Sequence, residues 1–152
     1  MTLMRRTATG EIVPMTEAEI AALRPTLDAR RTSRAAAVDD VLDARIRRYP
    51  HDFGAPHGVL HLQLRDAEDR TNWLVLRTSA GELVAAGLGH MLLPLRTEEN
   101  IVVTLTAADV ALVMRQMAAW GAALLAHSWV LKDAIRVSDD PESIHITAGW
   151  PA

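Results

Sequence analysis

The sequence predicts an α+β fold: a single domain in which a short antiparallel sheet of about three strands packs on a long C-terminal helix, preceded by an N-terminal helical arm. Short alternating or β-branched segments lie between residues 59 and 105, and a regular apolar spacing follows Thr106. The length of 152 residues suits one modest core. We expect an extended segment and arm at 1–50, and an α+β domain at 51–152 with its long helix at 106–137.

The N-terminal part predicts an extended segment and a short helix. Residues 2–15 have no helical periodicity, and a few strand residues are expected there. Thr16 and Glu19 have the spacing of a capping box, in which a hydroxyl and a carboxylate satisfy free N–H groups. Pro25 then ends the short helix, because it disfavours helical geometry at the residue before it.

A second helix is expected from residue 26 to about residue 49. Its apolar stripe, which includes Val38 and Leu42, is thin. Such a helix gains most of its stability from a partner, which is either the rest of the fold or another subunit. Residues 50–58 are rich in proline and glycine and predict a loop.

Three strands and one helix are expected before the long helix. Residues 59–65 alternate apolar and polar side chains, as a half-buried strand does. Asp66 begins a helix over roughly 66–86. Strands follow at 91–96 and 101–105, and Pro94 predicts an edge position for the first of them.

The long helix carries the most regular pattern in the chain. Thr106 and Asp109 form a capping signature at its start. A heptad-like seam then runs along it, made of Val110, Met114, Met117, Gly121, Leu124, Ser128, Leu131 and Ile135. Gly121 and Ser128 are small, which permits the close approach of a partner. We therefore predict that this seam, with Val38 and Leu42, contributes to contacts between subunits.

Trp120 and Trp129 lie off this seam and predict a second surface on the same helix. Tryptophan serves both in cores and at the centres of interfaces. Both alternatives stay open for these two residues, which complete the set of interface candidates.

Composition excludes several function classes. The net charge of −3 argues against nucleic-acid binding as the main activity, and the absence of cysteine removes thiol chemistry. No uninterrupted apolar run of about 18 residues is present, so no membrane span is expected. His51, His57 and His61 do not have metal-ligand spacing, and no serine lies in a nucleophile elbow. We expect no enzymatic activity, no catalytic residue, no metal and no cofactor.

Four C-terminal segments resemble an uncharacterised family of bacteriophage and prophage tail proteins, encoded in tail and tail-fibre gene clusters. They are LRTEEN at 95–100, VTLT at 103–106, LKDAI at 131–135 and IHITAGWP at 144–151. Residues 10–19, GEIVPMTEAE, are similar to segments of short tail proteins that include some tail-fibre assembly proteins. The middle of the chain, around Trp73 and residues 81–89, departs from the family pattern.

The residues of this signature have structural roles rather than chemical ones. Asn100 suits a hairpin turn, Thr106 caps the long helix, and Lys132 lies near the helix C-terminus, where a cation meets the dipole favourably. Trp150 is placed to hold the C-terminal tail on the domain. Ile135 and Gly149 complete the signature.

The resemblance implies a virion component of the tail tip, baseplate or fibre attachment. We expect it to contact other tail subunits, to form a homo-oligomer, and to lie in the virion tail after assembly in the host cytoplasm. A tail-fibre assembly chaperone that is absent from the finished particle is the first alternative. An unrecognised small hydrolase or metal-dependent enzyme is the second.

Overall fold

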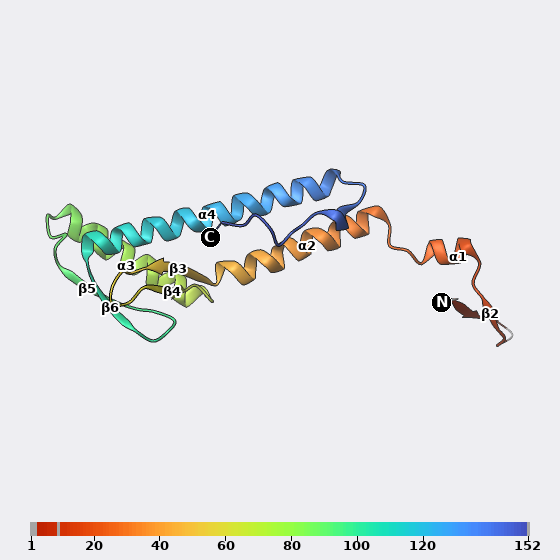
Figure 1. Ribbon diagram of the computed structural model, residues 1–152, viewed down its shortest axis with the longest axis horizontal. Coiled ribbons are helices and arrows are strands. Elements are labelled where there is room, and N and C mark those ends of the chain that lie inside the picture. Colours follow the sequence, from red (N-terminus) through yellow and green to blue (C-terminus); the bar gives the residue numbers. More distant parts are fainter. Residues whose placement is uncertain (1–2, 9, 152) are drawn as a thin grey trace.

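The computed structural model describes residues 3–8 and 10–151 (Figure 1). Residues 1, 2, 9 and 152, which the predicted N-terminal segment and C-terminal domain include, lie outside this part. The α+β class, the long C-terminal helix and the N-terminal helical region are confirmed. The elements are β1 (Met4–Arg6), β2 (Ile12–Pro14), α1 (Glu17–Ala22), α2 (Leu27–Ile46), β3 (Arg48–Asp52), β4 (Val59–Gln63), α3 (Ala67–Ala85), β5 (Leu92–Arg96), β6 (Val102–Thr106), α4 (Ala107–Val137) and a 3₁₀ turn at Pro141–Ser143.

In the part of the chain that the structure describes, the strands form three separate two-stranded antiparallel sheets instead of one sheet of about three strands. β1 pairs with β2, β3 with β4, and β5 with β6. The partner of β4 is β3, a segment that overlaps the predicted loop at 50–58. Proline is tolerated at Pro50 and Pro94, because every strand of a two-stranded sheet has one edge without a partner.

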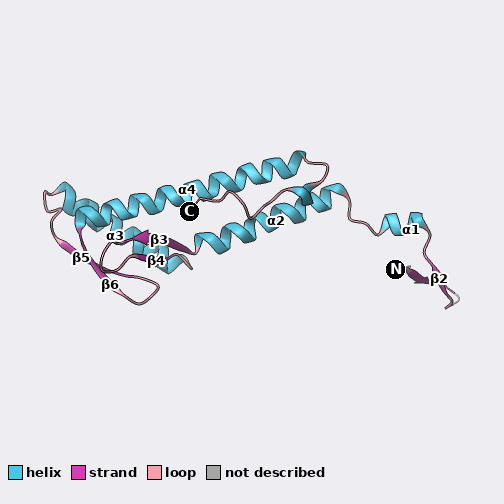
Figure 2. Ribbon diagram, in the orientation of Figure 1, coloured by secondary structure: helices cyan, strands magenta, loops and turns pink. Residues whose placement is uncertain are grey.

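α4 is the axis of the fold (Figures 1 and 2). Its N-terminal half packs against α3 and the hairpins β3–β4 and β5–β6, around Leu62, Ala80 and Met114. Its C-terminal half packs against α2, around Val38 and Ile135. The described residues therefore form two apolar clusters, one near each end of the same helix.

α2 belongs to this core and is not part of a separate arm. It lies along α4, and the predicted division at residue 50 falls within β3. The segment that extends away from the core is shorter and consists of β1, β2 and α1 (Figure 1). The capping box of α1 is present: Thr16 Oγ1 accepts from Glu19 N at 3.3 Å, and Glu19 accepts from Thr16 N at 2.8 Å.

Candidate functional site

The predicted seam on α4 is the chain's own core. Val110, Met114, Leu124 and Ser128 are almost completely buried, and Leu131 and Ile135 are buried with them. Val38 and Leu42 of α2 are buried as well. The thin stripe of α2 and the seam of α4 thus find their partners within one chain, and the predicted subunit contact does not lie at these residues. Apolar periodicity identifies a buried face but does not say which chain covers it.

Three further candidates lie at the margin of the core. Met117 and Trp120 are half-buried and pack on the first cluster, where the rings of Trp120 and Tyr49 are 5.3 Å apart. A Cβ atom added at Gly121 would meet nothing within 4 Å, so no described element approaches this residue closely. The small size of Gly121 therefore has no packing reason within the described chain.

Trp129 is the one interface candidate that lies on the opposite side of α4, and 62% of its surface is exposed. It belongs to a second stripe that we call the outer face. Its members are all exposed and are Leu112, Arg115, Ala119, Ala122, Ala126, Trp129 and Asp133, with Val130 and Val137 beside them. Val130 and Val137 are 65% and 75% exposed. Sequence reasoning missed this stripe, although its alternating spacing of three and four residues was a visible signal.

α4 also has the length and apolar composition of a membrane-crossing helix, the only helix of the described part that does. The core helix of a globular protein passes the same test, and one side of α4 is packed against α2 and α3. Its composition follows from having one buried apolar face and one exposed apolar face.

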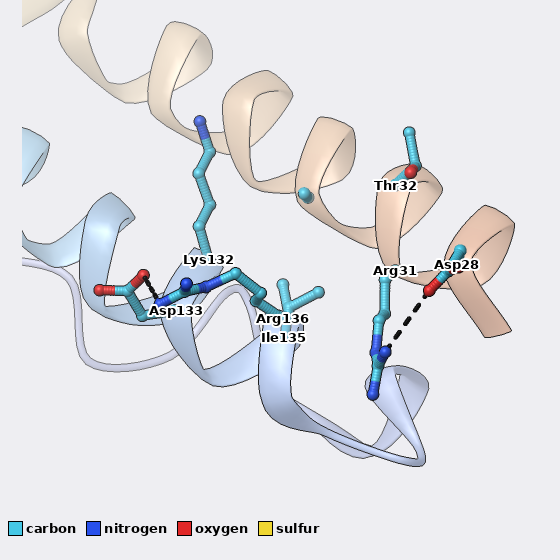
Figure 3. A pocket seen from close by; sticks show the side chains of 8 residues that line it. Asp28, Arg31, Thr32, Lys132, Asp133, Ile135 and Arg136 are labelled. Atoms are coloured by element: carbon cyan, nitrogen blue, oxygen red, sulfur yellow. Dashed lines mark hydrogen bonds and ion pairs between the residues drawn. The ribbon is translucent and has the colours of Figure 1, made fainter.

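An open groove of about 490 Å³ lies between the start of α2 and the end of α4 (Figure 3). Its charged side chains are paired: Arg31 with Asp28 at 3.5 Å and with Asp139 at 3.7 Å, and Arg136 with Asp133 at 3.1 Å. Lys132 reaches across to Asp39 of α2. Because positive and negative groups alternate and are paired, the groove does not favour a ligand of one charge.

A second depression of about 290 Å³ lies beside Trp120 and is lined in part by Arg45, Arg48 and His61. His61 Nδ1 lies 2.7 Å from Glu99 Oε1, and this hydrogen bond holds the pKa of Glu99 at about 2. The indole Nε1 of Trp120 is buried and has no hydrogen-bond partner in the described structure. No group of three or more His, Asp or Glu side chains suited to a metal ion occurs among the described residues.

The signature residues hold the fold together. Asn100 adopts a left-handed φ of 66° in the turn between β5 and β6, and Thr106 Oγ1 accepts from Asp109 N at 3.1 Å at the start of α4. Lys132 binds Asp39, so it joins α4 to α2. Ile135 is buried in the second cluster.

Trp150 and Gly149 fix the C-terminal tail, as predicted for the tryptophan. The indole packs on the second cluster and donates from Nε1 to the carbonyl of Ile146 at 2.8 Å. His127 of α4 meets the indole edge-on with ring centres 4.8 Å apart. Gly149 has a φ of 76°, and a Cβ atom there would come within 3.2 Å of His127. The C-terminal tail is therefore packed against the rest of the fold.

Comparison with known proteins places the chain in a family. No curated protein and no solved structure matches the chain. Residues 28–148, from the first turn of α2 to the C-terminal tail, match a family described as a domain of unknown function, DUF4376. The match covers more than half of the chain and includes both apolar clusters. The chain therefore belongs to the DUF4376 family.

Proposed function

We propose that this protein is a structural component of a bacteriophage tail, at the tail tip, baseplate or fibre attachment, and that it works through protein–protein contacts. The observation that carries the contact role is the outer face of α4, where Trp129, Val130 and Val137 are more than half exposed on the longest helix. Contiguous exposed apolar surface of this kind marks interaction sites. The tail assignment draws on the resemblance of residues 95–151 to phage tail proteins.

Ion pairs between titratable side chains support a structural role. Glu99 is bound to His61, and Glu142 is bound to Arg30, which holds the pKa of Glu142 at about 2. Arg30 also pairs with Asp140 at 2.9 Å. These pairs join segments distant in the sequence, as expected of groups that stabilise a fold.

Mass spectrometry of purified particles from the phage or prophage that encodes the chain tests the proposal. We expect the chain in intact particles, in stoichiometric amounts with the tail proteins. Its presence on fibre intermediates in lysates but absence from particles would instead establish the assembly chaperone. Absence from both would overturn the tail proposal.

A complementation assay tests whether the outer face is the contact surface. In a strain that lacks the gene, Trp129→Glu is expected to give fewer infective particles, because a charge then lies on the outer face. Val59→Glu is the matched control, since Val59 is 60% exposed on β4 and is not part of the outer face. Equal yields from both variants would argue against a contact at Trp129.

A further inference from the structure

The outer face of α4 is a second seam, opposite to the buried one. Seven residues follow each other at alternating intervals of three and four: Leu112, Arg115, Ala119, Ala122, Ala126, Trp129 and Asp133. This is the spacing by which one helix packs along another over several turns. The seven residues span about 32 Å at 1.5 Å per residue. All seven are exposed, and Asp133 also lines the groove between α4 and the start of α2.

The order of side chains along this seam is self-complementary about residue 124. Arg115 and Asp133 lie at equal distances on the two sides of this centre and carry opposite charges. Ala119 and Trp129 are likewise equidistant, and one is small where the other is large. Ala122 and Ala126 flank the centre, and both are small. These three pairs match in charge or in volume, and Leu112, the seventh residue of the seam, has Arg136 as its counterpart about the same centre.

This pattern fits a partner of one kind. In a two-fold symmetric contact, residue i of one copy meets residue j of the other, and j meets i. We propose that the outer face binds the outer face of a second copy of this chain, with the two α4 helices antiparallel and the two-fold axis at residue 124. Arg115 then faces Asp133 of the second copy at both ends, and Trp129 covers Ala119.

The charges at the two ends are available for this contact. Arg115 has no ion pair or hydrogen bond among the described residues. Asp133 accepts from Arg136 at 3.1 Å, but its side chain is 72% exposed. A carboxylate has about four acceptor positions, so Asp133 retains room for a second guanidinium.

Other partners do not use this symmetry. Two parallel copies would place Arg115 beside Arg115 and Asp133 beside Asp133, and such like-charge contacts are strongly unfavourable. Neither a different protein nor a lipid bilayer requires a face whose two halves complement each other. Alanines form the centre of the face. Their small side chains let two helix axes come closer than the usual interaxial distance of about 8–10 Å.

A charge swap in the full chain tests the contact. Light scattering and sedimentation equilibrium are expected to show a dimer. Arg115→Asp and Asp133→Arg should each weaken the dimer by at least about tenfold, because each places like charges at both ends. The double variant Arg115→Asp/Asp133→Arg should restore the affinity. Arg24→Asp, which makes the same charge change at an exposed residue outside the face, should leave the affinity unchanged.

Disulfide trapping tests the orientation of the two helices. Because the chain has no native cysteine, only the introduced cysteines can form a disulfide. Arg115→Cys and Asp133→Cys variants should cross-link when mixed, and neither should cross-link alone. In the antiparallel pair the two copies of position 115 lie about 18 residues, or about 27 Å, apart along the helix axis. In a parallel pair they would be adjacent. The mixed pair also keeps one intact contact between Arg115 and Asp133.

Four results would overturn the proposal: a monomer at about 100 µM, a dimer that ignores the charge swap, cross-linking of either cysteine variant alone, or flotation with phosphatidylcholine–phosphatidylglycerol vesicles without dimer formation. Circular dichroism of each variant excludes loss of the fold as a cause. The proposal goes beyond the tail role and is independent of it, since a dimer without particle association would support this contact and reject only the tail.

Discussion

Glu99, in the turn between β5 and β6, binds His61 of β4, 38 residues earlier in the sequence: its Oε1 lies 2.7 Å from His61 Nδ1. The same carboxylate accepts from the backbone N–H of His61 at 3.1 Å, and the backbone N–H of Glu98 donates to the carbonyl of His61 at 2.8 Å. The turn between β5 and β6 thus covers the open edge of β4. This is how separate two-stranded sheets form one end of a single core without sharing a ladder.

We predict that Glu99→Gln destabilises the fold by about 1 kcal/mol at pH 7, because the charge-assisted hydrogen bonds to His61 are weakened. The pKa of Glu99 is lowered from its ordinary 4.5 to about 2, chiefly by the side-chain bond with His61. The stabilisation from this group is therefore complete above pH about 4.5 and is lost as the pH falls through about 2.

Urea unfolding followed by circular dichroism at pH 7 and at pH 2 measures this difference. The gap between wild type and Glu99→Gln should shrink at the lower pH. Glu98→Gln is the control, because Glu98 makes only a weak pair with Arg48 at 3.9 Å. An equal effect of the two substitutions at pH 7 would contradict the role given to Glu99.

Leu124 and Leu125 are neighbours on α4 with opposite environments, at 0% and 38% exposure. Leu124→Ala should lower the free energy of unfolding by about 3 kcal/mol, since it leaves a cavity between α4 and its neighbours. Leu125→Ala should cost less than about 1 kcal/mol, as most surface substitutions do. Chemical unfolding of both variants provides the comparison. Similar values would mean that α4 buries a different face.

Gly121 and Gly149 should respond to alanine with opposite signs. Gly121 lies inside α4 with free space around it, so Gly121→Ala is expected to stabilise the protein by up to about 1 kcal/mol. Gly149 has a positive φ and His127 close by, so Gly149→Ala is expected to destabilise it by about 1 kcal/mol or more. Thermal unfolding shows the sign directly. A dimer weakened by Gly121→Ala would revive the predicted subunit contact at this glycine.

Trp150 should be the main anchor of the C-terminal tail. Trp150→Ala removes the contact with His127 and the second cluster, and a loss of about 3 kcal/mol is expected. Trp150→Phe keeps a ring but loses the hydrogen bond to Ile146, and about 1 kcal/mol is expected. Limited proteolysis of both variants should show the tail cleaved faster in Trp150→Ala. Unchanged cleavage would mean that other contacts hold the tail.

The elements whose position depends on neighbouring residues in the sequence could be predicted from the sequence. The start of α4 at Thr106 and the hairpin of β5 and β6 follow from capping, turn and β-branched residues. β3 was not predicted, because the proline at position 50 indicated a loop. This segment is a strand only through its pairing with β4. The partner of the α4 seam was assigned to another subunit, because helical spacing does not reveal whether α2 or a second chain covers it. The outer face was overlooked because alanine is common in helices for propensity alone.

The pairing of α2 with the far end of α4 sets an order for folding during synthesis. Val38 packs against Leu131 and Ile135, which are synthesised much later. Ile146 of the C-terminal tail belongs to the same cluster and is synthesised later still. About 80 residues separate the end of α2 from the half of α4 that covers it, which a ribosome adds in roughly 4–16 s. During that interval α2, with its thin apolar stripe, has no partner within its own chain. The hairpin end of the molecule can form first, and the α2 end closes only when the last residues have been made.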